Sequence, residues 1–223
     1  MNENGIRNDD MKNGRLTIMV SSAVYGYQEF LDRIYDLLMS MGYEVWMSHK
    51  GTIPVDSSRD TIECCLDAVR KCDLFLCIIT GTYGKTMRDG FSATHLEMQE
   101  AIKRNKLRWF LVDDRVVFAR SFLKHLNYDG SNIDRQRLSI SKGWTQFDNL
   151  RLVEMYEEAC NVINLDSGTP SVNWVQTYEN ANAALLFAHA QFSRYLELEE
   201  ILRKNLADKA LVQNRIKETK EGK

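Results

Sequence analysis

Residues with hydroxyl or carboxylate groups, together with several glycines, gather directly after short apolar runs of this sequence. Ser21 and Ser22 follow the first run, a glycine-containing loop at residues 81–93 follows the third, and Glu97 comes shortly after that loop. Groups of these kinds bind sugars and phosphates. The residues singled out as a candidate site are Ser21, Ser22, Tyr25, Gly81, Tyr83, Gly84, Asp89, Ser92, Thr94 and Glu97.

Glu97 is expected in the first turn of a helix that Ser92 or Thr94 caps. The positive end of the helix dipole would partly stabilise a carboxylate there. Acidic residues are common in first turns, so Glu97 is either an ordinary helix-start residue or a functional carboxylate. The neighbouring His95 has no second histidine close by in the sequence and is interpreted as an ordinary helix residue.

Several catalytic and metal-binding classes are disfavoured by spacing. Gly84-Lys85-Thr86 resembles the end of a Walker A loop, but Ile79 stands where that loop requires its first glycine. The G-x-G-x-x-G fingerprint is absent after the first apolar run, and H-E-x-x-H and G-x-S-x-G do not occur. The five cysteines contain no C-x-x-C pair and no zinc-finger spacing, so we expect reduced thiols and no metal site.

The elements that would position these residues alternate between strand and helix. Apolar runs at residues 15–20, 43–47, 73–80 and 108–112 predict strands, and amphipathic segments between them predict helices. This alternation predicts an α/β fold with an open, doubly wound parallel sheet of flavodoxin-like type, in the strand order 2-1-3-4, with a possible fifth strand. In such a sheet, ligands bind outside the carboxyl ends of the strands, where the singled-out residues fall.

The predicted organisation has four parts. They are a disordered leader at 1–14, the α/β domain at 15–126, a linker or long loop at 127–146, and an α-helical region at 147–223. Apolar residues of the helical region, among them Trp174, Leu186 and Phe192, are expected to pack on the α/β domain or on a second copy of the chain. The net charge of −2 and the short apolar runs favour neither nucleic-acid nor membrane binding. The cysteine pattern of reduced thiols, and a polar stretch at residues 1–14 without the apolar run of a signal peptide, predict a cytoplasmic protein.

Three segments resemble a TIR-like bacterial domain of unknown function that is related to nucleoside 2-deoxyribosyltransferases and to NAD-cleaving TIR domains. The segments are TIMVSSAVYG (Thr17–Gly26), CDLFLCIITGTYG (Cys72–Gly84) and FSATHLEMQEAIKRNK (Phe91–Lys106). Thr94, Glu97 and Ala101 keep the spacing of the family's S-x-T-x-x-E-x-x-x-A motif. By this resemblance, Glu97 falls on the glutamate that carries N-glycosidic chemistry in those enzymes.

The resemblance implies a nucleotide N-glycosidase or cyclase that acts on NAD or a related nucleotide, in bacterial antiphage defence. NAD would be a substrate, and no bound cofactor is expected. Ser21, Ser22, Gly81 and Gly84 would hold phosphate or ribose, and tyrosines of the site would stack on a base. A non-catalytic nucleotide sensor or assembly module and a nucleoside deoxyribosyltransferase are the alternatives. A second copy of the chain and a downstream effector protein are the expected partners.

Overall fold

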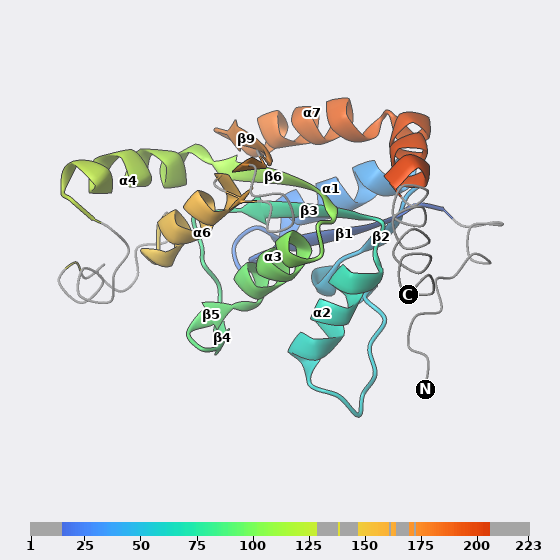
Figure 1. The fold of residues 1–223 in the computed structure, drawn as a ribbon, viewed down its shortest axis with the longest axis horizontal. Helices are drawn as coiled ribbons and strands as arrows, with labels where there is room; N and C mark the ends of the chain where they lie inside the picture. The colour runs from blue at the N-terminus through green and yellow to red at the C-terminus, as the bar shows by residue number, and fades with distance from the viewer. Residues whose placement is uncertain are drawn as a thin grey trace, which may run out of the picture.

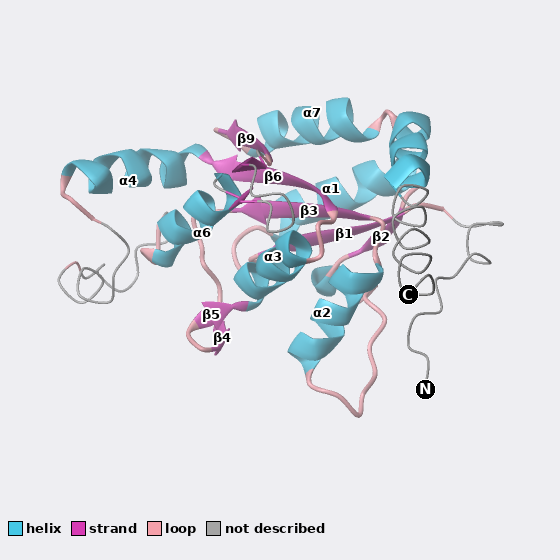
Figure 2. Cartoon of the chain, viewed as in Figure 1, coloured by secondary structure: helices cyan, strands magenta, loops and turns pink. Residues whose placement is uncertain are grey.

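The computed structural model describes residues 15–128, 138, 147–160, 162–163, 170–171 and 173–205 of the chain. Its centre is a five-stranded sheet with helices on both faces, as Figures 1 and 2 show. The expected leader at 1–14 and nearly all of the expected linker at 127–146 lie outside the described residues. No helix within the described ranges is long and apolar enough to cross a membrane.

The sheet is parallel throughout, in the order β2-β1-β3-β6-β9. Its strands are β1 (Thr17–Ser22), β2 (Glu44–Trp46), β3 (Leu74–Ile79), β6 (Leu107–Asp113) and β9 (Trp174–Tyr178). The first four strands confirm the predicted doubly wound α/β fold and its order, and β9 is the fifth strand. All six residues of β3 are buried, as expected for a central strand that is covered on both faces.

The helices divide between the two faces of the sheet (Figure 1). α1 (Gln28–Ser40) and α7 (Ala181–Phe192) contact each other on one face. The other face carries α2 (Thr61–Lys71), α3 (Ala93–Lys103), α4 (Asp114–His125) and α6 (Arg151–Cys160). The shorter elements are a 3₁₀ turn (Ser48–Lys50), the pair β4 (Thr86–Arg88) and β5 (Phe91–Ser92), and the pair β7 (Val162–Ile163) and β8 (Pro170–Ser171).

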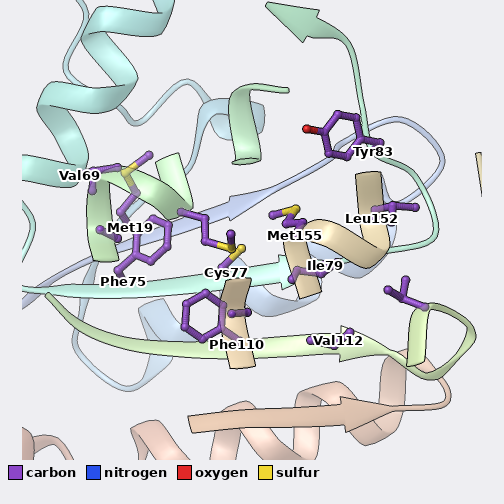
Figure 3. Close-up of a cluster of buried hydrophobic side chains, with 14 of the residues drawn as sticks. Met19, Val69, Phe75, Cys77, Ile79, Tyr83, Phe110, Val112, Leu152 and Met155 are labelled. Carbon is purple, nitrogen blue, oxygen red and sulfur yellow. The ribbon is translucent and has the colours of Figure 1, made fainter. Parts of the chain in front are cut away.

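Alternating side chains of the strands build two separate cores. Phe75, Cys77 and Ile79 of β3 point toward α2, α3 and α6, where they join the cluster drawn in Figure 3. Leu76 and Ile78 of the same strand point to the opposite face and pack with residues of α1 and α7. The period of two along β3 therefore assigns its buried residues alternately to the two cores.

Part of the region at 147–223 that was expected to be α-helical is in fact a strand, β9, which is followed by the helix α7. β9 pairs with β6 over five residues, from Trp109↔Trp174 to Asp113↔Tyr178. Its sequence, WVQTY, is rich in aromatic and β-branched residues, which favour a strand over a helix. The side chain of Asn180 then caps α7 by accepting a hydrogen bond from the Ala183 N–H.

The C-terminal region packs on the α/β core, as expected for part of its apolar surface. Phe192 and Leu198 are buried in the core shared with α1, and residues 195–205 are helical. Trp174 and Leu186 stay exposed, at 62% and 70%. The region therefore contributes both a strand and a covering helix to the sheet.

Candidate functional site

The predicted site lies where the chain reverses its direction of winding across the sheet. From β1 the chain runs to β2 on one side, and β3 then pairs with β1 on the other side. The loops that follow β1 and β3 are in contact, because a Cβ atom added to Gly84 would lie 3.6 Å from that of Ala23. Gly84 has φ of +82°, a conformation that other residues rarely adopt. This is the position at which open α/β sheets bind their ligands.

Glu97 lies in the second turn of α3, which corrects its expected place in the first turn. The β4–β5 hairpin carries the chain to Ser92, and the Ser92 hydroxyl accepts the backbone N–H of His95 at 3.3 Å as the N-cap. The helix therefore begins at Ala93, and Glu97 points inward one turn later. Its side chain is only 5% exposed. The helix dipole acts mainly within the first turn, so burial dominates the state of this carboxyl group.

Among the described residues, Glu97 has polar partners but no cation beside it. The Ser21 hydroxyl of β1 donates a short hydrogen bond to Oε2 of Glu97, and the Cys65 thiol of α2 is a second partner. Burial raises the pKa of Glu97 to about 7, while the bonds from Ser21 and Cys65 lower it in part. Within the described residues, Glu97 makes no ion pair. The group is thus a buried acid that titrates near neutral pH.

The other candidates after β1 and β3 have varied surroundings. The Ser22 hydroxyl donates to the carbonyl oxygen of Ile78 at 3.0 Å, and so links β1 to β3. The Gly81 N–H donates to the hydroxyl of Tyr27 at 3.2 Å. Tyr25 extends into solvent with 82% exposure. Of the predicted binding residues, Ser21 is the one that forms a hydrogen bond with Glu97.

Tyr83 is buried and lies at one end of a series of polar side chains that runs through His95 of α3 to Glu158 of α6. Its hydroxyl lies 2.7 Å from Nδ1 of His95, and Nε2 of the same ring lies 3.2 Å from Oε2 of Glu158 on α6. Gln99 donates to that carboxylate at 3.0 Å. Although burial opposes it, His95 and Gln99 hold the pKa of Glu158 below its usual value. His95 on α3 therefore lies next to polar groups of both the loop after β3 and α6.

The remaining candidates lie around the start of α3. Asp89 is exposed at the turn between β4 and β5, with φ of +54°. Ser92 and Thr94 are buried, and Ser92 has the capping role described above. These residues shape the entry to the helix that carries Glu97. Among the described residues, no group of three or more His, Cys, Asp or Glu residues could hold a metal ion.

A family model described as a domain of unknown function, DUF4062, matches residues 17–142. This chain belongs to the DUF4062 family. The matched range covers β1 to α4, and so includes the two loops at the sheet edge and Glu97. Comparison with curated proteins gives no match.

Two solved structures are similar to this DUF4062 chain. The CMP N-glycosidase of Clostridium botulinum has a TM-score of 0.40 and 12% sequence identity, over 78% of this chain and 98% of that chain. A conserved protein from Enterococcus faecalis V583 has a TM-score of 0.41 and 12% identity, over 80% of this chain and 99% of that chain.

Four further residues at this edge of the sheet were not among the predicted site residues of this DUF4062 chain. Cys65 reaches Glu97 from the inner face of α2. Its spacing along that helix is typical of a core residue, so the sequence did not mark it as part of the site. Tyr27, Asp113 and Arg115 form a polar group at the same edge of the sheet. The position of Asp113 at the end of a predicted strand is a signal that marks this group, since charged residues there face the ligand side.

Proposed function

We propose that this protein is a nucleotide N-glycosidase or cyclase that acts on NAD or a related nucleotide, with Glu97 as its catalytic carboxylate. The observation that carries the proposal is the state of Glu97, a buried acid with a pKa of about 7 at the switch point of the sheet. A strongly perturbed titratable group in such a position is a candidate for function, because the fold gains no stability from ionising it.

The proposed chemistry needs only one carboxylate. The nicotinamide of NAD is a cationic leaving group, so the C1′–N bond breaks with its electron pair moving to the ring nitrogen, and nicotinamide leaves neutral. The ionised Glu97 carboxylate stabilises the oxocarbenium-like transition state. In hydrolysis, water then adds its oxygen to C1′ and Glu97 accepts the proton that water releases. In cyclisation, a nucleophile within the same nucleotide takes the place of water.

Ser21 has a defined part in this mechanism. Its hydroxyl donates to Oε2 and so orients the carboxyl plane, and it favours the charged form that the reaction requires. Because Glu97 is only 5% exposed, we expect the loops after β1 and β3 to move apart when a sugar reaches it. The contact of Gly84 with Ala23 joins those two loops in the present state.

The cellular setting belongs to the same proposal. The motif resemblance supports three parts of the proposal: a relationship to TIR-like domains, a role in antiphage defence, and a downstream effector protein as partner. A cytoplasmic location is supported by the cysteines, because all five are free thiols. Exposed Trp174 on the edge strand and exposed Leu186 on α7 support contact with a second copy of the chain.

The near-complete burial of Glu97 also favours a second candidate, a nucleotide sensor that binds without turnover. The two candidates are separated by incubating the full chain with NAD, NADP and the ribonucleoside monophosphates, and measuring the free base by chromatography. A parallel reaction with a deoxynucleoside and a second free base tests for deoxyribosyl transfer. The glycosidase proposal expects release of the base, whereas the sensor expects saturable binding with no release.

The matched variants are Glu97→Gln and Glu100→Gln, which remove one carboxylate each from the same helix. Loss of one preorganised electrostatic group lowers the rate about 10²–10³-fold, and we expect that effect for Glu97→Gln alone. Glu100 binds Arg70 and Arg104 outside the site, so its variant should keep the rate per folded molecule. Equal rates for the two variants would remove Glu97 from the mechanism.

A further inference from the structure

A second polar group lies at the same edge of the sheet, beyond β6. Asp113 ends that strand and caps α4, and its side chain is 5% exposed. Arg115 lies two residues later and grips this carboxylate with two donors, Nε to Oδ1 at 2.7 Å and Nη2 to Oδ2. A fork-like pair of this kind fixes the plane of the guanidinium. The Arg115 side chain is nevertheless 41% exposed, so its outer edge faces solvent.

Tyr27 connects Arg115 to the loop after β3. Its hydroxyl oxygen accepts the Gly81 N–H at 3.2 Å and lies 3.4 Å from the donating Nη2 of Arg115. An oxygen that accepts two hydrogen bonds keeps its own proton for a third partner. Among the described residues, neither that proton nor Nη1 of Arg115 has a hydrogen-bond acceptor. The Tyr27 hydroxyl and the Arg115 guanidinium thus each have a hydrogen-bond donor available for a ligand.

Tyr178 adds an independent sign of a missing partner. It is paired with Asp113 in the sheet register, and it lies within electrostatic reach of Tyr27 and Arg115. Its hydroxyl is buried without a hydrogen-bond partner among the residues that the structure describes. A buried hydroxyl is rarely left unpaired in a folded protein, and such a group usually marks the place of a water or a ligand.

The loop at residues 21–27 joins this group to Glu97. Ser21, at one end of the loop, binds the Glu97 carboxylate, and Tyr27, at the other end, binds Arg115 and Gly81. A ligand that lies along this loop would meet a carboxylate at one end and a cation with a free hydroxyl at the other. A nucleotide has the matching pattern, because its glycosidic carbon and its 5′-phosphate lie at opposite sides of the ribose.

We infer that Arg115 and Tyr27 bind the 5′-phosphate of the substrate, so that the site selects nucleotides over nucleosides. The inference rests on the proposed function for the position of the glycosidic bond at Glu97. Arginine suits this task, because its guanidinium can hold a carboxylate on one edge and a phosphate on the other. Asp113 acts as a positioning residue that keeps the guanidinium in place. The same preference would disfavour nucleoside deoxyribosyl transfer as the activity.

The test is calorimetric titration of the full-length Glu97→Gln protein, which retains the fold while turnover is slowed. The probes are three nucleotides and their nucleosides: nicotinamide mononucleotide with nicotinamide riboside, CMP with cytidine, and AMP with adenosine. At least one nucleotide should bind tenfold or more tightly than its nucleoside. Adding Arg115→Met or Tyr27→Phe should weaken the nucleotide roughly 10- to 100-fold, the usual effect of losing a charge-assisted hydrogen bond, and should leave the nucleoside unchanged.

Arg120→Met is the matched control, because Arg120 is on the same helix but pairs with Glu157 outside the site. Tyr27→Phe leaves the Asp113–Arg115 pair intact, so it remains informative if Arg115→Met fails to fold. Three results would each overturn the inference. They are equal affinity for nucleotide and nucleoside, no nucleotide binding at millimolar concentration, and equal weakening of nucleotide and nucleoside binding by the variants. Tighter binding of nucleotides than of nucleosides, with no base release by the wild type, would support the phosphate site and refute the glycosidase proposal. Base release by the wild type, with equal binding of nucleotides and nucleosides, would support the glycosidase proposal and refute the phosphate site.

Discussion

Replacing Glu97 with glutamine should stabilise the folded protein at neutral pH. Glutamine keeps the size of the side chain and can still accept the hydrogen bond from Ser21, but it carries no charge. The pKa of Glu97 is about 7 in the fold, against 4.5 for an ordinary glutamate. Each unit of pKa difference corresponds to about 1.4 kcal/mol, so ionised Glu97 lowers the free energy of unfolding by about 3 kcal/mol.

The effect has a defined dependence on pH. Below pH 4.5, Glu97 is protonated in both the folded and the unfolded chain, so the wild type and Glu97→Gln should be about equally stable. Between pH 4.5 and 7, the folded protein holds the additional proton, and wild-type stability falls as pH rises. Above pH 7 the full difference should persist. The gain from the variant therefore grows across this window and then levels off.

Urea unfolding in reducing buffer at pH values from 5 to 8, followed by circular dichroism, measures this difference. Glu100→Gln on the same helix is the control with the opposite sign. Burial opposes ionisation of Glu100, but ion pairs with Arg70 at 2.7 Å and Arg104 at 2.9 Å hold its pKa below the ordinary value. Its charge stabilises the fold above the unfolded pKa, so Glu100→Gln should be less stable than wild type at pH 8. A Glu97→Gln protein that is less stable at pH 8, or that differs from wild type by the same amount at all pH values, would refute the reasoning.

Three further outcomes follow from the same contacts. The rate of base release should rise with pH through about 7, because the ionised form of Glu97 is the active one, and a rate that falls over this range would indicate an acid role instead. Ser21→Ala removes a bond that lowers the pKa of Glu97, so it should move that rise to higher pH in the same assay. Tyr83→Phe leaves Nδ1 of buried His95 without its partner, and should lower the free energy of unfolding by about 1–3 kcal/mol in urea titrations, without altering the pH of the rise.

The central sheet could be predicted because its strands are marked by local sequence. The apolar run at Leu74–Ile79 is too short for a buried helix and lies between two amphipathic segments, so a central parallel strand is its natural interpretation. The loops at the carboxyl ends of β1 and β3 follow from the order of the strands. The position of the candidate site was therefore predictable from residues close together in the sequence.

The edge strand β9 could not be predicted in the same way. Its five residues are only partly buried, and they pair with β6 across some sixty intervening residues. The neighbouring segment 181–192 has strong helical character, which suggested that the helix began earlier. Strand preference depends on the surface against which the side chains pack, and that surface is supplied by a distant part of the chain.

The inner face of α3 could not be predicted from apolar periodicity either, because several of its buried side chains are polar. These polar side chains include the candidate catalytic residue. The buried residues of this helix include the polar side chains of His95, Glu97 and Glu100. His95 has the Tyr83 hydroxyl and the nearby Glu158 carboxylate, and Glu100 has two arginines. Within the described structure, Glu97 alone of the three lacks an oppositely charged partner, although a buried charge is normally paired.

A purely structural explanation of Glu97 has to account for that difference. Glutamine at this position would keep the contact with Ser21 and avoid the unfavourable ionisation, so the carboxylate is not needed to hold the helix in place. In the proposed mechanism the active form of Glu97 is ionised, and a permanent cation beside it would weaken the electrostatic stabilisation that it gives to the oxocarbenium ion. The lack of an ion pair to Glu97 among the described residues therefore fits the proposed chemistry, in which the positive charge that faces the carboxylate is the substrate in its transition state.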